Sequence, residues 1–150
     1  MNVPAPSAPP PQAGELGQSD AGAVAERLGF APEQIVQEFG WDDDVDEELR
    51  RVVESAIGAE LEDEDYTGET DVALMWWRAE DGDVTDALVD MVGVLEEGGF
   101  VVLLTPRGEG AVDPSVVDEA AGTAGLHSAG TVNAGESWRA TKLVAPKSRR

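Results

Sequence analysis

The fold of this chain is decided by residues 71–105, DVALMWWRAEDGDVTDALVDMVGVLEEGGFVVLLT. The two ends of this stretch, Asp71–Trp77 and Phe100–Leu104, are apolar on both faces, which is typical of central strands in a parallel sheet. Between them, apolar residues recur at helical spacing after Asp83, a residue suited to cap a helix, and Gly98-Gly99 ends the segment. The pattern predicts a strand, helix and strand unit with a right-handed crossover.

Upstream of this unit the sequence predicts a helix, a strand and a second helix. A short apolar stripe over Ala21–Leu28 has helical spacing, and Gln34–Phe39 is short and apolar enough for a strand. From Asp44 to Ile57 the apolar residues fall on one face of a helix, for which Asp43 or Asp44 is a natural N-cap. A short strand through Leu61 is a further candidate.

Downstream, the sequence predicts one helix and a terminal hairpin. Asp113-Pro114 starts a helix that runs to about Thr123, with an N-cap followed by proline at the first helical position. Leu126–Ala145 surrounds an Asn133-Ala134-Gly135 turn signal and is typical of an antiparallel hairpin. The predicted fold class is therefore α/β, a three-layer sandwich with a mostly parallel, Rossmann-like sheet that ends in an antiparallel hairpin.

The domain organisation follows from composition along the chain. Residues 1–20 hold five of the nine prolines and show no hydrophobic period, which indicates a disordered, proline-rich arm. Residues 21–147 form a single α/β domain, and residues 148–150 are a basic tail. No apolar run approaches the length of about 20 residues that a membrane-spanning helix needs, and no secretory signal is visible, so we expect a cytoplasmic protein.

Charge constrains the partners of this chain more than any motif does. Its 150 residues carry 10 Lys and Arg against 31 Asp and Glu, a formal charge of −21. Such a surface repels nucleic acid and anionic membranes, which argues against direct binding to either, and favours an unidentified partner protein with a basic surface. The absence of cysteine excludes disulfides, thiolate metal sites and cysteine nucleophiles.

A crevice is expected beyond the carboxyl ends of the parallel strands, where open α/β sheets bind ligands. The residues that follow the three strands make a candidate partner-binding or ligand-binding rim: Trp41, Asp42, Trp77, Arg78 and Arg107. A nucleotide or adenosylmethionine site needs several glycines after the first strand, whereas this chain has Gly40 alone and then carboxylates that repel phosphate. We therefore expect no cofactor.

Acidic residues are concentrated in two short runs that form a candidate contact surface: Asp43, Asp44 and Asp46 in the first, and Glu62, Asp63, Glu64 and Asp65 in the second. The first run resembles the start of an EF-hand loop. Glu47 stands where that loop needs glycine and Val53 where it needs glutamate, so we expect no metal site. The single histidine, His127, has no catalytic partners at a recognisable spacing and is expected on the surface.

Several segments in order resemble the uncharacterised actinobacterial family named domain of unknown function three thousand and fifty-two. They are Arg27–Phe30, Ile35–Asp42, Leu74–Arg78, Leu104–Arg107, Ala124–Leu126, Trp138 and Leu143–Lys147. The resemblance implies a cytoplasmic, compact α/β protein with no established catalytic activity, and it supplies no active-site residues. The second half is also similar to the distal half of class I methyltransferases, although the glycine-rich loop of the first half is missing.

Three functional hypotheses remain open. The leading one is a non-catalytic, regulatory protein that acts through protein contacts at the rim and the acidic runs. The first alternative is a degenerate methyltransferase-like enzyme or small-molecule sensor with a pocket at the strand ends. The second is an acidic nucleic-acid mimic that occupies a basic groove on its partner.

Overall fold

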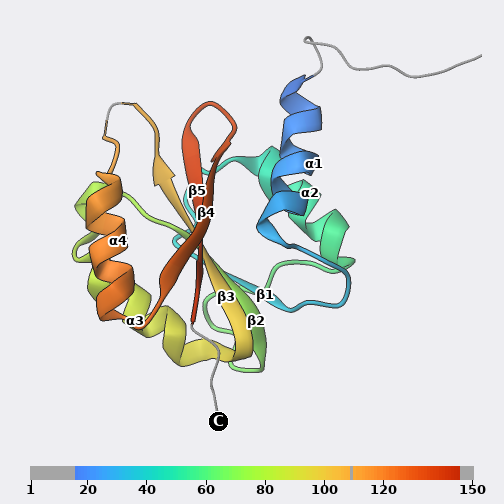
Figure 1. Ribbon diagram of the computed structural model, residues 1–150. Helices are drawn as coiled ribbons and strands as arrows, with labels where there is room; N and C mark the ends of the chain where they lie inside the picture. Colours follow the sequence, from blue (N-terminus) through green and yellow to red (C-terminus); the bar gives the residue numbers. More distant parts are fainter. Residues whose placement is uncertain (1–15, 109, 146–150) are drawn as a thin grey trace, which may run out of the picture.

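The computed structural model describes residues 16–108 and 110–145 and shows a five-stranded sheet between two pairs of helices (Figure 1). The sheet order is β1-β2-β3-β5-β4, in which β1, β2 and β3 are parallel and β5 is antiparallel to both of its neighbours. The predicted α/β fold, a mostly parallel sheet ending in a hairpin, is confirmed. The elements in chain order are α1 (Leu16–Leu28), β1 (Val36–Phe39), α2 (Glu47–Ile57), β2 (Thr70–Trp76), the 3-10 helix η2 (Ala79–Asp81), α3 (Val84–Val94), β3 (Leu95–Pro106), α4 (Pro114–Thr123), β4 (His127–Ala134) and β5 (Trp138–Val144).

Alternate residues of the buried strands face two separate cores. Trp76 and Leu74 pack with α1 and α2 on one face of the sheet, whereas Trp77 and Ala73 pack with α3 and α4 on the other. Because neighbouring residues of a strand point to opposite faces, the adjacent tryptophans separate as predicted. Trp76 is fully buried, with its ring edge-on to that of Trp138 at a centroid distance of 5.0 Å.

The connection from α2 to β2 contacts β1 first at its outer edge and then on its opposite face. After α2, Glu62 forms an isolated parallel bridge with Gln37 on the outer edge of β1, where the Glu38 amide donates to the Glu62 carbonyl at 2.8 Å. The short strand predicted through Leu61 is thus reduced to this bridge. The chain then passes over the opposite face, where the Gln37 side chain donates to the Tyr66 carbonyl, before it enters β2 on the inner side of β1.

Several element boundaries differ from the sequence expectations. Helix α1 begins at Leu16 and not at Ala21, so the expected arm overlaps it by five residues (21 − 16 = 5). No proline lies between Pro11 and Ala21 to end the helix. The rest of the arm, residues 1–15, and the basic tail, residues 148–150, lie outside the described residues.

The N-cap of α2 is Asp46, whereas Asp43 or Asp44 was expected. The Asp46 carboxylate accepts the Leu49 amide at 3.1 Å, while Asp44 is bound by an arginine from another loop. The helix therefore begins at Glu47. The other predicted caps, Asp83 and Asp113, are confirmed, since each accepts the amide two residues further on.

Strand β3 begins at Leu95, five residues before the expected Phe100 (100 − 95 = 5). The helix ends at Val94, before the glycines that were expected to end it. Gly98-Gly99 lies inside β3, where the register against β2 shifts between the pairs Thr70–Leu95 and Val72–Phe100. A Cβ on Gly99 would lie 2.6 Å from the Asp71 carbonyl oxygen, so glycine is required for the close approach of the two strands.

None of the described helices combines the length and the apolar character that crossing a membrane requires.

Candidate functional site: a crevice at the strand ends

The loops that follow β1 and β2 lead to opposite faces of the sheet. Residues 40–46 run from β1 to α2, and residues 77–83 run from β2 to α3. Because neighbouring strands whose loops part in this way leave a crevice at their carboxyl ends, the fold places a crevice between β1 and β2. This is the edge at which the sequence placed the candidate rim.

Arg78 fastens the two loops together across the crevice. Its guanidinium donates to the Gly40 carbonyl at 2.7 Å, to the Trp76 carbonyl at 3.1 Å, and to both carboxylate oxygens of Asp44. The same group lies over the ring of Trp138 at 5.4 Å, a cation–π arrangement. Only 13% of the Arg78 side chain is exposed, so the guanidinium is held between the loops that follow β1 and β2.

The charge state of this pair follows from its contacts. The hydrogen bonds from Arg78 hold the pKa of Asp44 below its ordinary value of 3.8, and partial burial opposes them. The pKa of Arg78 is raised by its hydrogen bonds to Asp44, and Asp81 and Asp42 add to that effect. Both groups are therefore charged at neutral pH.

We predict that Asp44→Asn lowers stability at neutral pH and has little effect in acid. A carboxylate with a lowered folded pKa stabilises the fold above its unfolded pKa, near 3.8, and the contribution is lost as the pH falls through the folded value. Since 53% of the Asp44 side chain is exposed, the expected loss is about 0.5 to 1 kcal/mol. Urea unfolding of wild type and variant at pH 7 and pH 3 measures it.

Asp43→Asn is the matched control, because it removes the same charge from a neighbouring exposed residue that forms no ion pair with another described residue. A destabilisation by Asp44→Asn that is equal at both pH values, or equal to that of Asp43→Asn, would contradict the Arg78 contact.

A buried carboxylate lies under the crevice, on the α2 side of the sheet. Glu38 in β1 is 6% exposed and accepts hydrogen bonds from Arg50 Nε at 2.7 Å, from Arg50 Nη2 at 2.8 Å and from Trp76 Nε1 at 2.8 Å. The pKa of Arg50 is raised, chiefly by this pair. Because both carboxylate oxygens are bound within the protein, Glu38 supports the crevice from below and is not a free acid or base.

On the α3 side of the sheet a cavity of about 710 Å³ opens along the whole length of α3. Its floor is formed by half-buried Phe39 and Met75, and Trp41, which is 52% exposed, also lines it. We call this cavity the acidic groove. Its lining residues are Phe39, Gly40, Trp41, Asp42, Glu64, Met75, Trp76, Trp77, Arg78, Asp81, Asp83, Asp86, Ala87, Asp90, Met91 and Val94.

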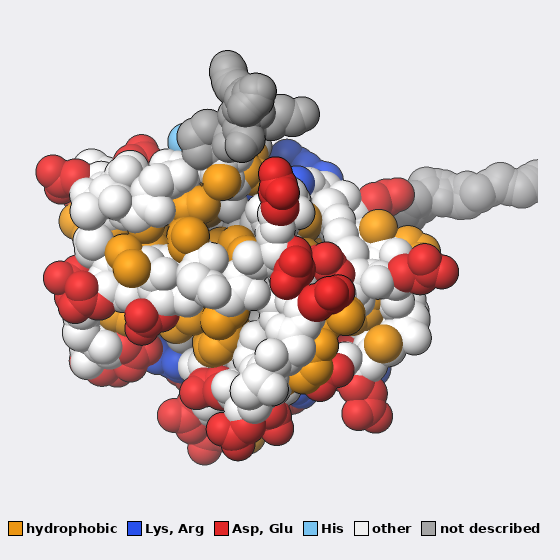
Figure 2. All heavy atoms as spheres, turned by 90° about the horizontal axis from the view of Figure 1, so that it is seen from below, with side chains coloured by type: hydrophobic (Ala, Val, Ile, Leu, Met, Phe, Trp, Pro, Cys, Tyr) orange, Lys and Arg blue, Asp and Glu red, His pale blue; other side chains and the backbone are white. Residues whose placement is uncertain are grey.

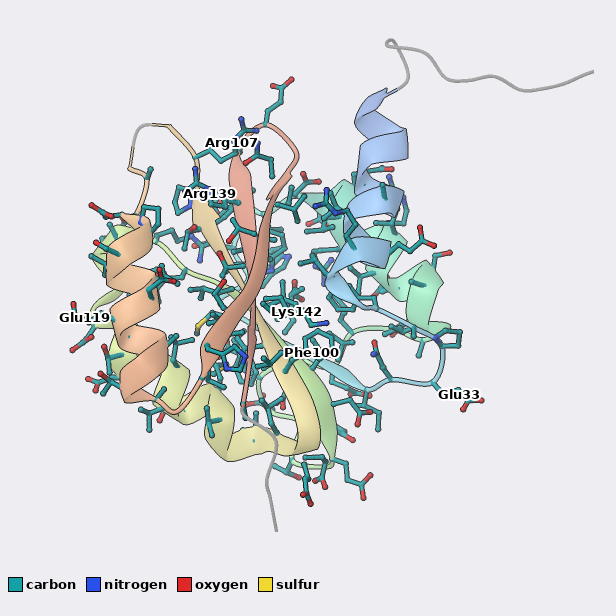
Figure 3. The ribbon with its side chains drawn as sticks, viewed as in Figure 1. Glu33, Phe100, Arg107, Glu119, Arg139 and Lys142 are labelled. Carbon is teal, nitrogen blue, oxygen red and sulfur yellow. The ribbon has the colours of Figure 1, made fainter. Side chains whose placement is uncertain are left out.

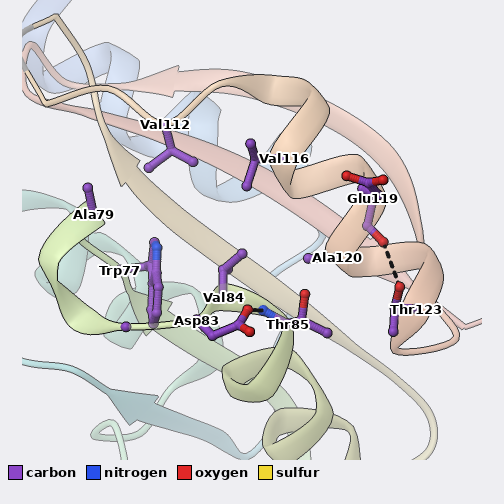
Figure 4. Close-up of a pocket in the computed structure, with 11 residues that line it drawn as sticks. Trp77, Ala79, Asp83, Val84, Thr85, Val112, Val116, Glu119, Ala120 and Thr123 are labelled. Carbon is purple, nitrogen blue, oxygen red and sulfur yellow. Dashed lines mark hydrogen bonds between the residues drawn. The ribbon is translucent and has the colours of Figure 1, made fainter.

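A second cavity of about 620 Å³ lies between the start of α3 and α4 (Figure 4). The Trp77 indole forms one side and Val112 and Val116 form the other. Trp77 and Asp83 line both cavities, so Trp77, at 5% exposure, is the wall between them. This arrangement makes Trp77 a structural element of the rim, while Trp41 is its exposed tryptophan.

Four of the five candidate rim residues come together at the acidic groove: Trp41, Asp42, Trp77 and Arg78. Arg107 does not join them. Its side chain donates to the Gly135 carbonyl at 2.6 Å and so contacts the hairpin of β4 and β5 (Figure 3). This follows from the sheet order. Strand β3 lies next to β5, so the loop after β3 meets the hairpin of β4 and β5 and not the loop after β1.

The two acidic runs meet at the rim. The Glu64 carboxylate accepts the Gly40 amide at 2.8 Å, which brings the second run beside Trp41. Within the first run Asp44 is paired with Arg78 and Asp46 caps α2, while Asp43 is exposed. In the second run Asp63 and Asp65 are exposed, and Glu62 is half-buried through its bridge to β1.

The site includes residues that the sequence did not single out. Asp86 and Asp90 line the acidic groove from α3, and Phe39 and Met75 form its floor. A signal for the two aspartates exists, since they share one helical face with Asp83 at spacings of three and four. For Phe39 and Met75 there is no comparable signal, because their exposure depends on how distant segments pack over the sheet.

The crevice residues do not fit adenosylmethionine or a nucleotide. A cofactor at this switch point needs free backbone amides between the strand ends, whereas Arg78 crosses the crevice there and the Gly40 amide is bound by Glu64. Among the described residues, no three or more acidic or histidine side chains gather closely enough to hold a metal ion. His127 is exposed at the start of β4.

The described residues have a Rossmann-like α/β fold that solved methyltransferases share. The chain is similar to a SAM dependent methyltransferase from Aquifex aeolicus, with a TM-score of 0.60 and 13% identity, over 90% of this chain and 94% of the other. It is also similar to the mitomycin 7-O-methyltransferase MmcR, with a TM-score of 0.62 and 15% identity, over 89% of this chain. The chain spans only 55% of that enzyme.

Residues 25–147 match the family described as protein of unknown function, DUF3052, and the chain belongs to that family. Uncharacterised proteins of Mycobacterium tuberculosis and Mycobacterium bovis are 47% identical to it over 131 residues. The match covers 86% of this chain and 82% of each relative. The family resemblance stated from the sequence is therefore confirmed, and so is the methyltransferase-like fold.

Proposed function

We propose that this protein is a non-catalytic, cytoplasmic binding protein with a regulatory role, and that it acts through contact with another protein at the acidic groove. The observation that carries the proposal is the position of Arg78. Its guanidinium binds the loops after β1 and β2 to each other across the crevice where open α/β sheets hold their cofactors. The groove beside it keeps an exposed tryptophan, which is a residue type that anchors protein interfaces.

Charge supports a partner with a basic surface. The chain carries a formal charge of −21, and acidic side chains are spread over the face shown in Figure 2, where basic ones are few. Opposite charge on the partner speeds encounter and selects against acidic partners. The expected rim residues Trp41, Asp42, Trp77 and Arg78 surround this contact, whereas Arg107 belongs to the neighbouring hairpin.

A specific observation favours a second candidate function, a small-molecule sensor or a degenerate methyltransferase-like enzyme. The cavity between α3 and α4 opens at the same edge of the sheet, with apolar side chains and the carboxylates of Asp83 and Glu119 along it. The similar proteins of known structure include a SAM dependent methyltransferase. The third candidate function is that of a nucleic-acid mimic. In that case this chain occupies a basic groove of the partner that otherwise binds DNA or RNA.

We predict that adenosylmethionine, its demethylated product and nucleotides leave the melting temperature of the full chain unchanged. Calorimetry with the same ligands provides the second measurement. Micromolar binding that Trp77→Ala abolishes would overturn the proposed function in favour of the sensor or enzyme.

The positive part of the proposal is tested by cross-linking and affinity capture from lysate at low and high salt. We expect a salt-sensitive partner that is lost with Trp41→Ala and kept with Val116→Ala, a control residue of similar exposure outside the acidic groove. Retention of the partner by Trp41→Ala would contradict the groove as the contact site. Displacement of the captured partner by DNA would identify the nucleic-acid mimic.

A further inference from the structure

One face of α3 is turned toward the acidic groove along the whole helix. The groove-lining residues of α3 and its cap recur at spacings of three and four: Asp83, Asp86, Ala87, Asp90, Met91 and Val94. At a rise of 1.5 Å per residue this stripe is about 16 Å long, or about three helical turns. The groove is therefore long and straight, unlike the compact pocket of a small ligand.

The floor of the groove is a part of the sheet that no described helix covers. Helix α3 packs on β2 and β3, and α4 packs on α3 and β4. On the same face of β1, residues 63–66 cover Gln37, which is 2% exposed, and the open part of the groove lies between these residues and α3, at Phe39. Phe39 and Met75 point to this face and remain half-buried. In a three-layer α/β fold such a position beside α3 is where another helix would pack.

Carboxylates stand on both sides of this apolar floor. Asp86 and Asp90 are exposed on α3 and form no ion pair with another described residue, and Glu64 and Asp42 line the groove next to the end of β1, where Glu64 accepts the Gly40 amide. The basic residue in the lining is Arg78, whose guanidinium is already bound to Asp44 and two carbonyls. A partner in the groove thus meets apolar atoms at the floor and unneutralised acids at the walls.

An added strand is a poor occupant, because the outer edge of β1 already bonds to Glu62. Segments of the chain outside the described residues do not match the groove either. Residues 1–15 contain no Lys or Arg, and residues 146–150 are too few for a helix of three turns. These features and the charge of the groove favour a basic segment of another protein as the occupant.

We propose that the acidic groove binds an amphipathic helix of a partner protein, about three turns long. Its apolar stripe packs on Phe39, Met75 and Trp41, and Lys or Arg residues at spacings of three and four face Asp86 and Asp90. The helix lies beside α3 as an additional helix of that layer. This inference rests on the proposed function and names the kind of partner segment involved.

The probe is a fluorescein-labelled peptide of about 16 residues, with leucines on one helical stripe and lysines on the flanking positions. Two comparison peptides have the same composition in scrambled order, or glutamate in place of every lysine. Fluorescence anisotropy with the full chain measures binding, and circular dichroism measures the helix content gained on binding. We expect the amphipathic cationic peptide to bind and to become helical, and the comparison peptides to bind at least about tenfold more weakly.

The double variant Asp86→Asn with Asp90→Asn should weaken binding of the amphipathic peptide about tenfold, because both cation partners are lost. Glu33→Gln with Glu136→Gln is the matched control. It also removes two negative charges, from exposed residues outside the groove, and Figure 3 shows Glu33 on the side of the molecule away from α3. Trp41→Ala should weaken binding to a similar extent, and Val89→Ala, at 50% exposure against 52% for Trp41, should not.

Equal binding of the amphipathic and scrambled peptides, or equal losses in the groove and control variants, would overturn the helix-binding inference. So would binding without any gain of helix. If no peptide binds while capture of a partner still depends on Trp41, the helix inference fails and the proposed function stands. If adenosylmethionine binds through Trp77, the proposed function fails whatever the peptides do.

Discussion

Replacing Arg50 with methionine should lower the free energy of unfolding by about 3 kcal/mol, because it strands a buried carboxylate. Glu38 is 6% exposed and receives two hydrogen bonds from Arg50, at 2.7 and 2.8 Å, and one from Trp76 at 2.8 Å. Without the guanidinium, the Glu38 carboxylate keeps only the hydrogen bond from the Trp76 indole, at a place that water reaches poorly. Urea unfolding followed by tryptophan fluorescence measures the loss.

Two further variants separate the buried pair from a general effect of charge. Arg51→Met removes a neighbouring arginine whose side chain is 67% exposed and pairs with Glu48, so we expect a change within about 0.5 kcal/mol. The double variant Glu38→Gln with Arg50→Met removes the stranded charge and should recover more than half of the loss. Equal stability of Arg50→Met and Arg51→Met would show that the Glu38 contact does not stabilise the fold.

Local patterns were enough to predict most of the fold. Strands β2 and β3 and helix α3 follow from runs of apolar residues and from helical spacing, which are properties of neighbouring positions. The opposite orientation of Trp76 and Trp77 follows from the alternation of side chains along a strand. The ends of helices and strands were less predictable. Asp44 does not cap α2 as expected, because its carboxylate binds Arg78, which lies 34 residues further along the chain.

The candidate site was predictable only in part, because its contacts join distant residues. Glu38 pairs with Arg50 and Trp76 at separations of 12 and 38 residues, and no spacing rule indicates such pairs. Arg107 follows a parallel strand as Arg78 does, yet the position of β5 beside β3 directs it to the hairpin. The carboxylates after β1 were expected to disfavour a cofactor, and the structure adds the arginine that Asp44 holds in the crevice.

The shape of the open groove depends on the connection between α2 and β2, residues 58–69. The chain forms one bridge beside β1 and then returns to β2 across the α3 side of the sheet. These residues cover Gln37 but leave Phe39 and Met75 half-buried at the groove floor, between the connection and α3. The same fold therefore combines a crevice closed by Arg78 with a large apolar and acidic surface next to it, which suits binding of a protein segment.

Gly40→Ala should be the most damaging small substitution at the crevice and should cost at least about 3 kcal/mol of stability. Gly40 has a φ of +78°, and a Cβ there would press into the Trp76 carbonyl oxygen, well inside van der Waals contact. That carbonyl is also an acceptor for Arg78, as is the carbonyl of Gly40 itself. An added methyl group therefore forces the loops after β1 and β2 apart and weakens the bonds that hold them together.

Gly58→Ala is a closely matched control. Gly58, the C-cap of α2, also has a φ of +78°, but no atom beyond its chain neighbours lies within 4 Å of the position of its Cβ. Its substitution should cost only the left-handed backbone strain, about 1 kcal/mol. The difference between the two variants in urea unfolding therefore isolates the close approach of the two loops. Equal losses would mean that the loops are not in contact at Gly40, and the closed crevice would no longer support a non-catalytic function.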